Sequence, residues 1–455
     1  MKKRWVALTM TMALGVSALA GIGCSAEAET ETETVMGAAE DAAAQAAATE
    51  TEAETEMPAE PELDPAGNYS LIQNVFNWGS SYSKVIIPAA DSNAEDYKVS
   101  VWRYGVDGSV LGQGERNITN AYASDAEGNA AEDGEYITLE MEVGAALGIG
   151  APYYTNPESF KGQLKDWAEC HYIIENTDST EIWNQLDTVY HPDEEKFSTA
   201  KFEDAEYAIP YAYYEPEEDG ADHPLVVWLH GAGSGGTDIG FVTGGMLVTN
   251  FVSEDVQNKF GGAHILLPQC ETWWMDDGSE ENLTTDGSSI YTESLKALID
   301  NYVETHKGVD TNRIYIGGCS NGGFMTINMV VNYPEYFAAE FPICEAYNDE
   351  WLSDEQINVL ASVPTWIVHS TNDPVVDIEK TAIPTYERIA AAGSENVHFT
   401  KYDQIIDPDY GNEYVGHFAW VPTLADLCTT DYDGSPVVVD EQEVTLYQWL
   451  ALQSK

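Results

Sequence analysis

The sequence of 455 residues predicts an α/β fold with a doubly wound, mostly parallel sheet, preceded by a small all-β sandwich. From about residue 198 onward, short apolar runs alternate with segments of helical periodicity, which is typical of a parallel sheet covered on both faces. Between residues 68 and 195, segments that alternate polar and apolar residues are separated by turn-rich stretches, which indicates half-buried strands. The number of these strands stays open, and residues 167–184 fit either domain.

Five apolar runs in the second part are predicted as strands: residues 224–229, 263–268, 313–317, 338–343 and 363–369. Residues 291–306 have apolar side chains at helical spacing and precede the run 313–317, as a right-handed β-α-β crossover requires. Residues 322–332 are predicted as the helix after that run, and residues 441–452 as the closing helix. The alternation supports a catalytic-type α/β domain over residues 196–455.

The most informative motif is Gly318-x-Ser320-x-Gly322, which lies between a predicted strand and a predicted helix. This pattern is typical of a sharp turn that presents a nucleophilic serine, because small residues on both sides let the strand and the helix approach each other. The five-residue pattern alone is common in loops. Its flanking strand and helix make Ser320 the candidate nucleophile.

A nucleophilic serine needs an acid and a base, which in this type of site follow it in the chain. Asp373 lies just past the strand 363–369, where open α/β sheets place functional groups. Asp377 is the competing acid, and we favour Asp373 because it is nearer to the strand end. A turn aspartate before proline is the ordinary alternative.

Only two histidines follow Asp373, namely His398 and His417. His398 lies inside an alternating strand pattern, residues 397–402, which favours a structural role. His417 lies in a glycine-containing loop before a helix-like stretch, from which a side chain can reach over the edge of the sheet. We therefore predict His417 as the general base, although a solvated loop histidine has the same local signature.

The oxyanion donors are predicted in the glycine-rich segment 230–236, which follows a buried strand. The backbone N–H of Asn321, the residue after the nucleophile, is one donor, and Ala232 supplies the other, with Gly231 or Gly233 as alternatives. His230 is expected to be structural. A phosphate-binding loop is disfavoured because the segment lacks the Gly-Lys-Ser/Thr ending.

These segments together resemble the esterase branch of the α/β-hydrolases, which includes polyhydroxybutyrate depolymerase-like and feruloyl esterase-like enzymes. The resemblance covers about residues 198–455 and implies Ser320, Asp373 and His417 as a triad acting through an acyl-enzyme. It implies no cofactor and no metal. Cys319, directly before the serine, is interpreted as a small buried hydrophobe rather than a second nucleophile. The layout also resembles esterases with an N-terminal immunoglobulin-like domain, here residues 68–195.

The sequence gives fewer indications of the substrate than of the reaction. Trp273, Trp274 and Trp420 are candidates for an aromatic platform that holds a sugar ring or an aromatic acyl group; packing on the protein body is the alternative for the first two. Short-chain acyl esters and plant-polysaccharide or feruloyl esters are the expected substrates. The alternatives are a prolyl oligopeptidase-like serine peptidase and a non-catalytic surface binding protein. The acidic run 276–281 matches no metal-binding loop.

The N-terminus predicts export. Basic residues precede an apolar run from residue 5 to 20, as in a signal peptide, assigned to residues 1–23. The following Cys24 suggests a bacterial lipoprotein, although Gly21 departs from the usual lipobox and cleavage after Ala20 is the alternative. Residues 24–67 are rich in Ala, Glu and Thr and predict an acidic disordered linker. The enzyme is then an extracellular, membrane-anchored lipoprotein.

The net charge of −59 disfavours nucleic acid and other anionic polymers as partners. A membrane contact is expected only through the lipid anchor, and a homo-oligomer formed through the β domain stays an open expectation. The chain has six cysteines. Without Cys24 five remain, their spacing matches no zinc site, and no disulfide is assumed.

Overall fold

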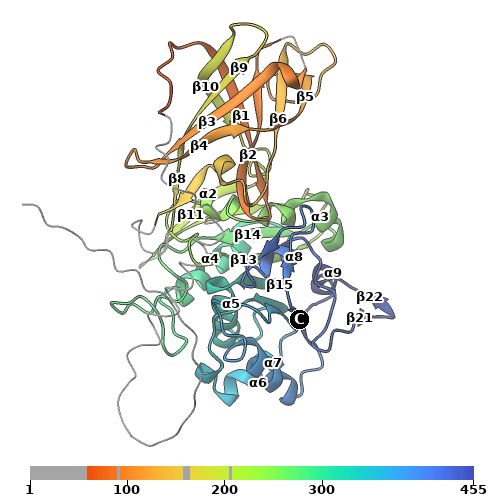
Figure 1. Ribbon diagram of the computed structural model, residues 1–455. Helices are drawn as coiled ribbons and strands as arrows, with labels where there is room; N and C mark the ends of the chain where they lie inside the picture. The colour runs from red at the N-terminus through yellow and green to blue at the C-terminus, as the bar shows by residue number, and fades with distance from the viewer. Residues whose placement is uncertain (1–58, 90–92, 157–163, 204–206) are drawn as a thin grey trace, which may run out of the picture.

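The computed structural model describes residues 59–89, 93–156, 164–203 and 207–455, which form an all-β domain above an α/β domain (Figure 1). The predicted signal peptide, Cys24 and the linker as far as residue 58 lie outside the described residues. Within the described ranges, no helix is both long and apolar enough to span a membrane.

The N-terminal domain is built on an eight-stranded sheet in the order β4-β3-β9-β10-β1-β2-β6-β5. All its paired strands are antiparallel except β1 and β10, which run parallel. Alternate side chains such as Val85, Val101 and Leu139 meet in one core and are fully buried. The strands are β1 Gly67–Phe76, β2 Gly79–Ile87, β3 Tyr97–Tyr104, β4 Val110–Arg116, β5 Ile118–Ser124, β6 Tyr136–Met141, β9 Glu169–Asn176 and β10 Ile182–Tyr190.

The all-β character of this region is confirmed, and the segment 167–184, left open above, belongs to it through β9 and β10. The end of the expected linker differs from the prediction. The Glu60 carboxylate accepts hydrogen bonds from the Tyr104 hydroxyl at 2.7 Å and lies 2.9 Å from His171 Nδ1, so the chain already packs on the sheet there. Acidic composition had suggested a free spacer, but two polar partners hold this residue.

The second domain contains an eight-stranded sheet in the order β11-β12-β14-β13-β15-β16-β17-β18. In this order, each strand from β14 to β18 is parallel to its neighbour. By contrast, β12 pairs antiparallel with both β11 and β14. The predicted α/β fold with a mostly parallel sheet is therefore confirmed. Its strands are β11 Ser198–Glu203, β12 Ala208–Tyr214, β13 His223–Leu229, β14 His264–Pro268, β15 Val309–Cys319, β16 Ala339–Ile343, β17 Thr365–Ser370 and β18 Val397–Tyr402.

Helices cover both faces of this sheet because its strands are apolar on both sides. On β13, Val226 and Trp228 pack in one core with α3, α8 and α9, whereas Leu225 and Val227 pack in another with α4, α5 and α6. Figure 1 shows these helices around the central strands. The helices are α2 Gly240–Thr243, α3 Glu254–Phe260, α4 Thr292–Thr305, α5 Asn321–Asn332, α6 Asp354–Ala361, α7 Ala382–Ala391, α8 Trp420–Leu424 and α9 Leu446–Ala451.

The closing helix is shorter than the predicted 441–452. It begins at Leu446, where Thr445 and Gln448 form a capping box that satisfies the first helical N–H groups. The preceding residues belong to a small hairpin of β21 Val438–Val439 and β22 Gln442–Glu443. A second small hairpin pairs β19 Ile405–Ile406 with β20 Glu413–Tyr414 in front of the His417 loop.

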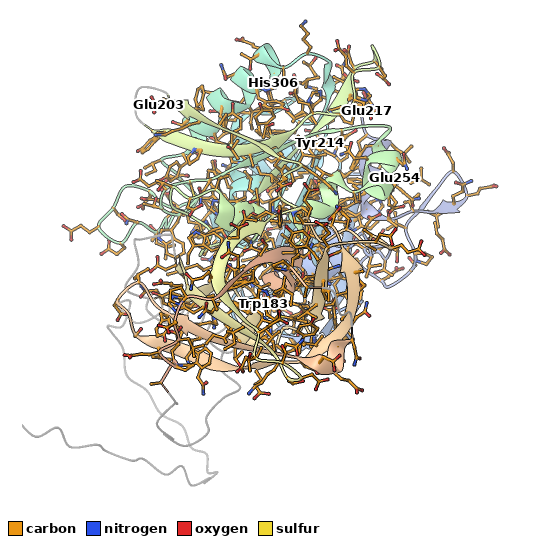
Figure 2. The ribbon with its side chains drawn as sticks, turned by 90° about the horizontal axis from the view of Figure 1, so that it is seen from above. Trp183, Glu203, Tyr214, Glu217, Glu254 and His306 are labelled. Atoms are coloured by element: carbon orange, nitrogen blue, oxygen red, sulfur yellow. The ribbon has the colours of Figure 1, made fainter. Side chains whose placement is uncertain are left out.

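The two domains contact each other at α2, the helix that follows the inner strand β13. A hairpin of β7 Tyr153–Thr155 and β8 Lys165–Trp167 reaches down from the β domain. The Trp167 ring stacks on Phe241 at 4.6 Å, and its Nε1 donates to Asp238 Oδ2 at 2.7 Å. Seen from above, Trp183 of the β domain lies in front, with Glu254 and His306 of the second domain behind it (Figure 2).

Candidate active site

Ser320 lies at the turn between β15 and α5, with φ 56° and ψ −116°. Such a conformation is strained for a residue with a side chain, and the neighbouring glycines allow it. A Cβ atom on Gly322 would lie 2.1 Å from the Leu229 carbonyl oxygen, and one on Gly318 would lie 2.5 Å from the same oxygen. Both positions therefore require glycine for the strand and the helix to pack this closely.

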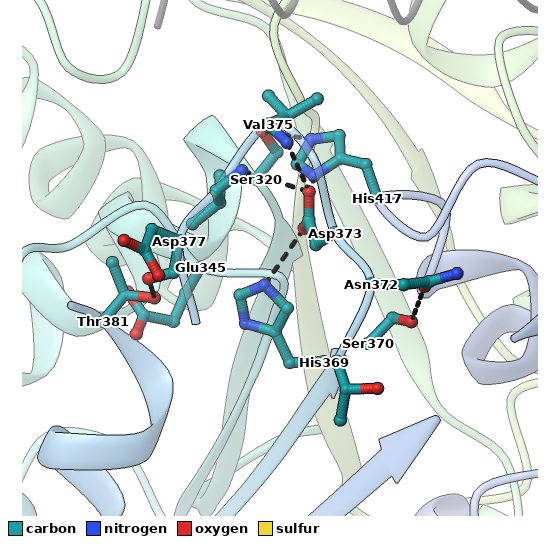
Figure 3. Close-up of polar contacts among 12 residues, drawn as sticks. Ser320, Glu345, His369, Ser370, Asn372, Asp373, Val375, Asp377, Thr381 and His417 are labelled. Atoms are coloured by element: carbon teal, nitrogen blue, oxygen red, sulfur yellow. Dashed lines mark hydrogen bonds and ion pairs between the residues drawn. The ribbon is translucent and has the colours of Figure 1, made fainter. Parts of the chain in front are cut away.

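Three side chains from separate loops meet at this turn (Figure 3). His417 Nε2 lies 3.0 Å from Ser320 Oγ, and His417 Nδ1 lies 2.8 Å from Asp373 Oδ2. Ser320 follows β15, Asp373 follows β17, and His417 lies in the loop before α8. The structure thus brings together the three residues that the sequence singled out, in the order nucleophile, base and acid.

The Asp373 carboxylate accepts four hydrogen bonds. Its Oδ1 accepts from the backbone N–H groups of Val375 and Val376 at 2.8 and 3.0 Å. Its Oδ2 lies within reach of His417 and also of His369 Nε2, at 3.0 Å. Burial alone would raise the pKa of this carboxyl, but the hydrogen bonds from His369 and His417 outweigh burial and hold the pKa well below its ordinary value. Asp373 is therefore ionised at neutral pH.

His369 is the polar partner that the sequence analysis did not identify. It appeared only as the last residue of the predicted strand 363–369, and the sequence signal that existed was its position four residues before Asp373. The competing residues take other roles. Asp377 is 54% exposed and caps the backbone N–H of Glu379, and His398 pairs with Asp431 at 2.9 Å.

The segment after β13, in which an oxyanion donor is predicted, packs against the Ser320 turn. A Cβ on Gly231 would lie 3.8 Å from the Ser320 Cβ, so this loop lies beside the nucleophile. His230 is buried and fixes the loop: Nδ1 donates to the Gly231 carbonyl at 2.7 Å, and Nε2 accepts from the Cys270 N–H. Burial lowers the pKa of His230 to about 4, so it stays neutral and structural.

The two predicted oxyanion donors lie at the start of α5 and in the loop after β13. Asn321 is the first residue of α5, and the first N–H groups of a helix have no acceptor within the helix. Ala232 is exposed between Gly231 and the buried Gly233, and Leu164 of the β domain lies against Gly233. The side-chain oxygen of Asn321 accepts a hydrogen bond from the Met275 N–H at 3.0 Å. This bond joins the loop after β14 to the Ser320 turn.

The predicted tryptophan platform is only partly available. Trp274 is 0% exposed and packs against His230 and Tyr291, so it supports the loop from behind and cannot contact substrate as predicted. The reason is that the loop turns this ring into the core and leaves Trp273 half-buried. Trp420 is also half-buried, and its ring meets the His417 ring at 5.5 Å and 90°. Trp273 and Trp420 thus remain candidates for substrate contact.

Two further sequence features have structural roles. Cys319 is buried, and burial raises the pKa of its thiol to about 12, which fits a small hydrophobe and not a nucleophile. The five cysteines in the described ranges are all free thiols. In the acidic run, the Asp276 carboxylate accepts from the Thr272 hydroxyl and the Gly278 N–H, so it organises its own loop.

Comparisons with known protein families match both domains of the chain. Residues 68–186 match the model of the esterase Ig-like N-terminal domain, and residues 216–408 match the phospholipase/carboxylesterase family. The two matches correspond to the two sheets described above. The second includes the segments that carry Ser320 and Asp373 and ends before His417.

A solved structure of a thermostable esterase aligns over 85% of this chain and 99% of its own, with a TM-score of 0.67 and 23% identity, which supports the shared fold. A curated relative, poly(3-hydroxyalkanoate) depolymerase C of Paucimonas lemoignei, is 42% identical over 50 residues. That match spans 11% of this chain and 12% of the relative. The chain thus combines a region similar to the phospholipase/carboxylesterase family with a preceding region similar to the esterase immunoglobulin-like domain, on the fold of a known esterase structure.

Proposed function

We propose that this protein hydrolyses carboxylic esters by a serine mechanism with Ser320, His417 and Asp373 as the triad. The observation that carries the proposal is the continuous hydrogen-bond chain from Ser320 Oγ to His417 Nε2 at 3.0 Å and from His417 Nδ1 to Asp373 at 2.8 Å. This is the arrangement that activates a serine hydroxyl, which is a weak nucleophile without an adjacent base.

In the proposed reaction, Ser320 Oγ attacks the ester carbonyl carbon while His417 takes the hydroxyl proton. Ionised Asp373 holds the imidazole in the tautomer that accepts at Nε2 and stabilises the imidazolium that forms. The N–H groups of Asn321 and of the loop at Ala232 stabilise the negative oxygen. His417 then returns the proton to the departing alcohol, and a water molecule releases the acid from the acyl-enzyme by the same steps.

The proposed substrates are short-chain acyl esters or plant-polysaccharide and feruloyl esters. Two half-buried tryptophans support an aromatic or sugar-bearing group: Trp420 beside His417, and Trp273 in the loop tied to Asn321 through Met275. The relative from Paucimonas lemoignei is a poly(3-hydroxyalkanoate) depolymerase, which agrees with ester chemistry. The strongly acidic chain, with a net charge of −59, favours neutral substrates over polyanions such as nucleic acid.

The test combines turnover with covalent labelling. Wild type and Ser320→Ala are compared on short- and long-chain p-nitrophenyl esters and on methyl ferulate, with Ser362→Ala, an exposed serine on the same domain, as the control. We expect activity and fluorophosphonate labelling to disappear only in Ser320→Ala. Labelling without turnover would retain the triad and reject the substrate classes. Unchanged turnover in Ser320→Ala would reject the triad.

We further propose that the enzyme acts outside the cell and is held by a lipid on Cys24, because a basic and apolar N-terminal segment precedes this residue. Expression in a bacterial host with membrane fractionation tests this. We expect the full chain in the membrane fraction and a Cys24→Ala variant in the soluble fraction; the same distribution for both proteins would reject the anchor.

A further inference from the structure

We propose that His369 is a positioning residue of the active site, which donates a hydrogen bond from Nε2 to the same Asp373 oxygen that receives His417. In this role it fixes the rotation of the carboxylate and limits the negative charge that the carboxylate offers to the base. The inference rests on the proposed function of Ser320, His417 and Asp373, and it concerns a residue that neither the motifs nor the comparisons single out.

The contact between His369 and Asp373 is completely buried. The side chains of His369 and Asp373 are both 0% exposed, and the Nε2–Oδ2 distance is 3.0 Å. Because the backbone N–H groups of Val375 and Val376 take Oδ1, His369 and His417 must share Oδ2 (Figure 3). With four donors the carboxylate of Asp373 cannot rotate. Its Oδ2 atom, which contacts His417, is therefore held in one position.

The hydrogen bond also defines the tautomer of His369. An ionised carboxylate only accepts, so the proton of the imidazole must lie on Nε2. His369 Nδ1 is buried and has no hydrogen-bond partner among the residues that the structure describes. A buried polar atom without a partner costs stability. We take this cost as a sign that the ring is retained for its other nitrogen.

The ionisable groups around the pair leave Asp373 as the charged carboxyl. At the end of β16, Glu345 and Cys344 are buried, and burial raises the pKa of both well above their ordinary values, so they stay neutral. On β18, Lys401 stands in register with His369, and its ammonium lies 3.7 Å from the centre of the Tyr432 ring. In the loop before α7, Asp377 is 54% exposed.

Loss of the His369 donor should therefore change His417 in a defined direction. A carboxylate with one donor fewer is more basic and holds a protonated His417 more strongly. The acid limb of the pH profile of kcat/KM, which reports the protonation of the free enzyme's base, then moves to higher pH. A carboxylate that can rotate also positions the imidazole less well, so kcat falls.

The test uses His369→Leu, which removes the donor, and His369→Gln, whose amide nitrogen can stand in for Nε2. For His369→Leu we expect kcat to fall about 10- to 100-fold. We expect its acid limb to rise by about 0.5–1 pH unit. His369→Gln should keep the wild-type limb. His398→Leu is the matched control, since it removes a histidine bonded to an aspartate at 2.9 Å, on β18 and away from Ser320; it should leave the limb unchanged.

A folded His369→Leu enzyme with an unshifted acid limb would overturn the inference, because a purely structural role predicts lower stability alone. Should His369→Leu fail to fold, nitrogen NMR of histidine-labelled wild type decides. We expect His369 to be protonated on Nε2, and protonation on Nδ1 overturns the inference. Fluorophosphonate labelling of Ser320 in the same preparations separates the two levels: loss of labelling in wild type rejects the triad and the inference with it, whereas normal labelling with an unshifted limb rejects only His369.

Discussion

The two domains bury different ionisable side chains, arginines in the first and carboxyls in the second. The β domain buries Arg103 and Arg116, which are 7% and 5% exposed, whereas the catalytic sheet buries the carboxyls of Glu340, Glu345 and Asp373. A guanidinium keeps its charge in proteins and must find acceptors, but a carboxyl can stay protonated instead. The first sheet therefore uses buried charge for structure, and the second has buried groups whose charge depends on their partners.

The hydrogen bonds of Arg116 and the pKa values of the buried carboxyls illustrate this difference. Arg116 donates to the Tyr172 hydroxyl at 2.9 Å and to the carbonyls of Tyr82 and Glu142 at 3.0 Å, which joins neighbouring strands. Among the three buried carboxyls of the second domain, burial raises the pKa of Glu340 to about 8 and that of Glu345 well above its ordinary value, whereas Asp373, with two imidazole donors, has a lowered pKa. Of these three buried carboxyls, the ionised one is thus the one that touches the base.

The largest expected effect is at that carboxylate. Asp373→Asn keeps the size of the side chain but presents His417 with an amide, which destabilises the required tautomer and the imidazolium. We expect kcat to fall about a thousandfold to ten-thousandfold, measured with p-nitrophenyl butyrate. Asp377→Asn is the control: this exposed side chain lies in the same loop, and its substitution should leave kcat within about twofold of wild type. Equal losses in both variants would contradict the assignment of the acid.

A smaller effect on a different quantity is expected in the β domain. Arg116→Met leaves a hydroxyl and two carbonyls without their donor in a buried site, and should lower the free energy of unfolding by about 3–5 kcal/mol. Urea unfolding at neutral pH measures it. Lys98→Met, which removes the exposed Lys98–Glu115 pair, should cost less than about 1 kcal/mol. An Arg116→Met protein as stable as wild type would show that this buried charge does not hold the sheet.

The active-site residues that sequence could predict are those that a local pattern specifies. The glycines around Ser320 are dictated by close backbone contacts, and Asp373 and His417 follow in a fixed order after defined strands. The fold class was predictable for the same reason, because apolar runs and helical periodicity alternate over a long stretch. Such features depend on residues near each other in the chain.

The remaining features depend on distant contacts. Trp273 and Trp274 are adjacent, and only the packing of Tyr291 and His230 decides that the second is buried. The role of His369 requires Asp373 to fold back onto the strand end, which composition does not show. The docking of Trp167 on Phe241 joins residues of different domains. The start of the last helix was the exception, since Thr445 and Gln448 form a readable capping box.

The smallest expected effect concerns the neutral carboxyl at the centre of the catalytic sheet. Glu340 Oε1 accepts from the Thr365 hydroxyl at 3.0 Å, and Oε2 has no partner among the described residues. Its folded pKa of about 8 lies above the value of about 4.3 expected in the unfolded chain. The native state therefore holds a proton that the unfolded state has lost, so this group's contribution to stability is full below about pH 4 and is lost as the pH rises towards 8.

Glu340→Gln removes this titration. Relative to wild type, the variant should gain about 2 kcal/mol of unfolding free energy between pH 5 and about pH 6.5, measured by urea unfolding at both values. Glu355→Gln, at an exposed position on α6, should show no such gain. If the variant instead lost unfolding free energy relative to wild type as the pH rises, Glu340 would be ionised in the native protein. The contrast with Asp373 would then be removed. A gain of the expected sign would show that the sheet tolerates a carboxyl at its centre because it remains protonated, and that ionisation at the site requires the imidazole donors that only Asp373 has among the three buried carboxyls.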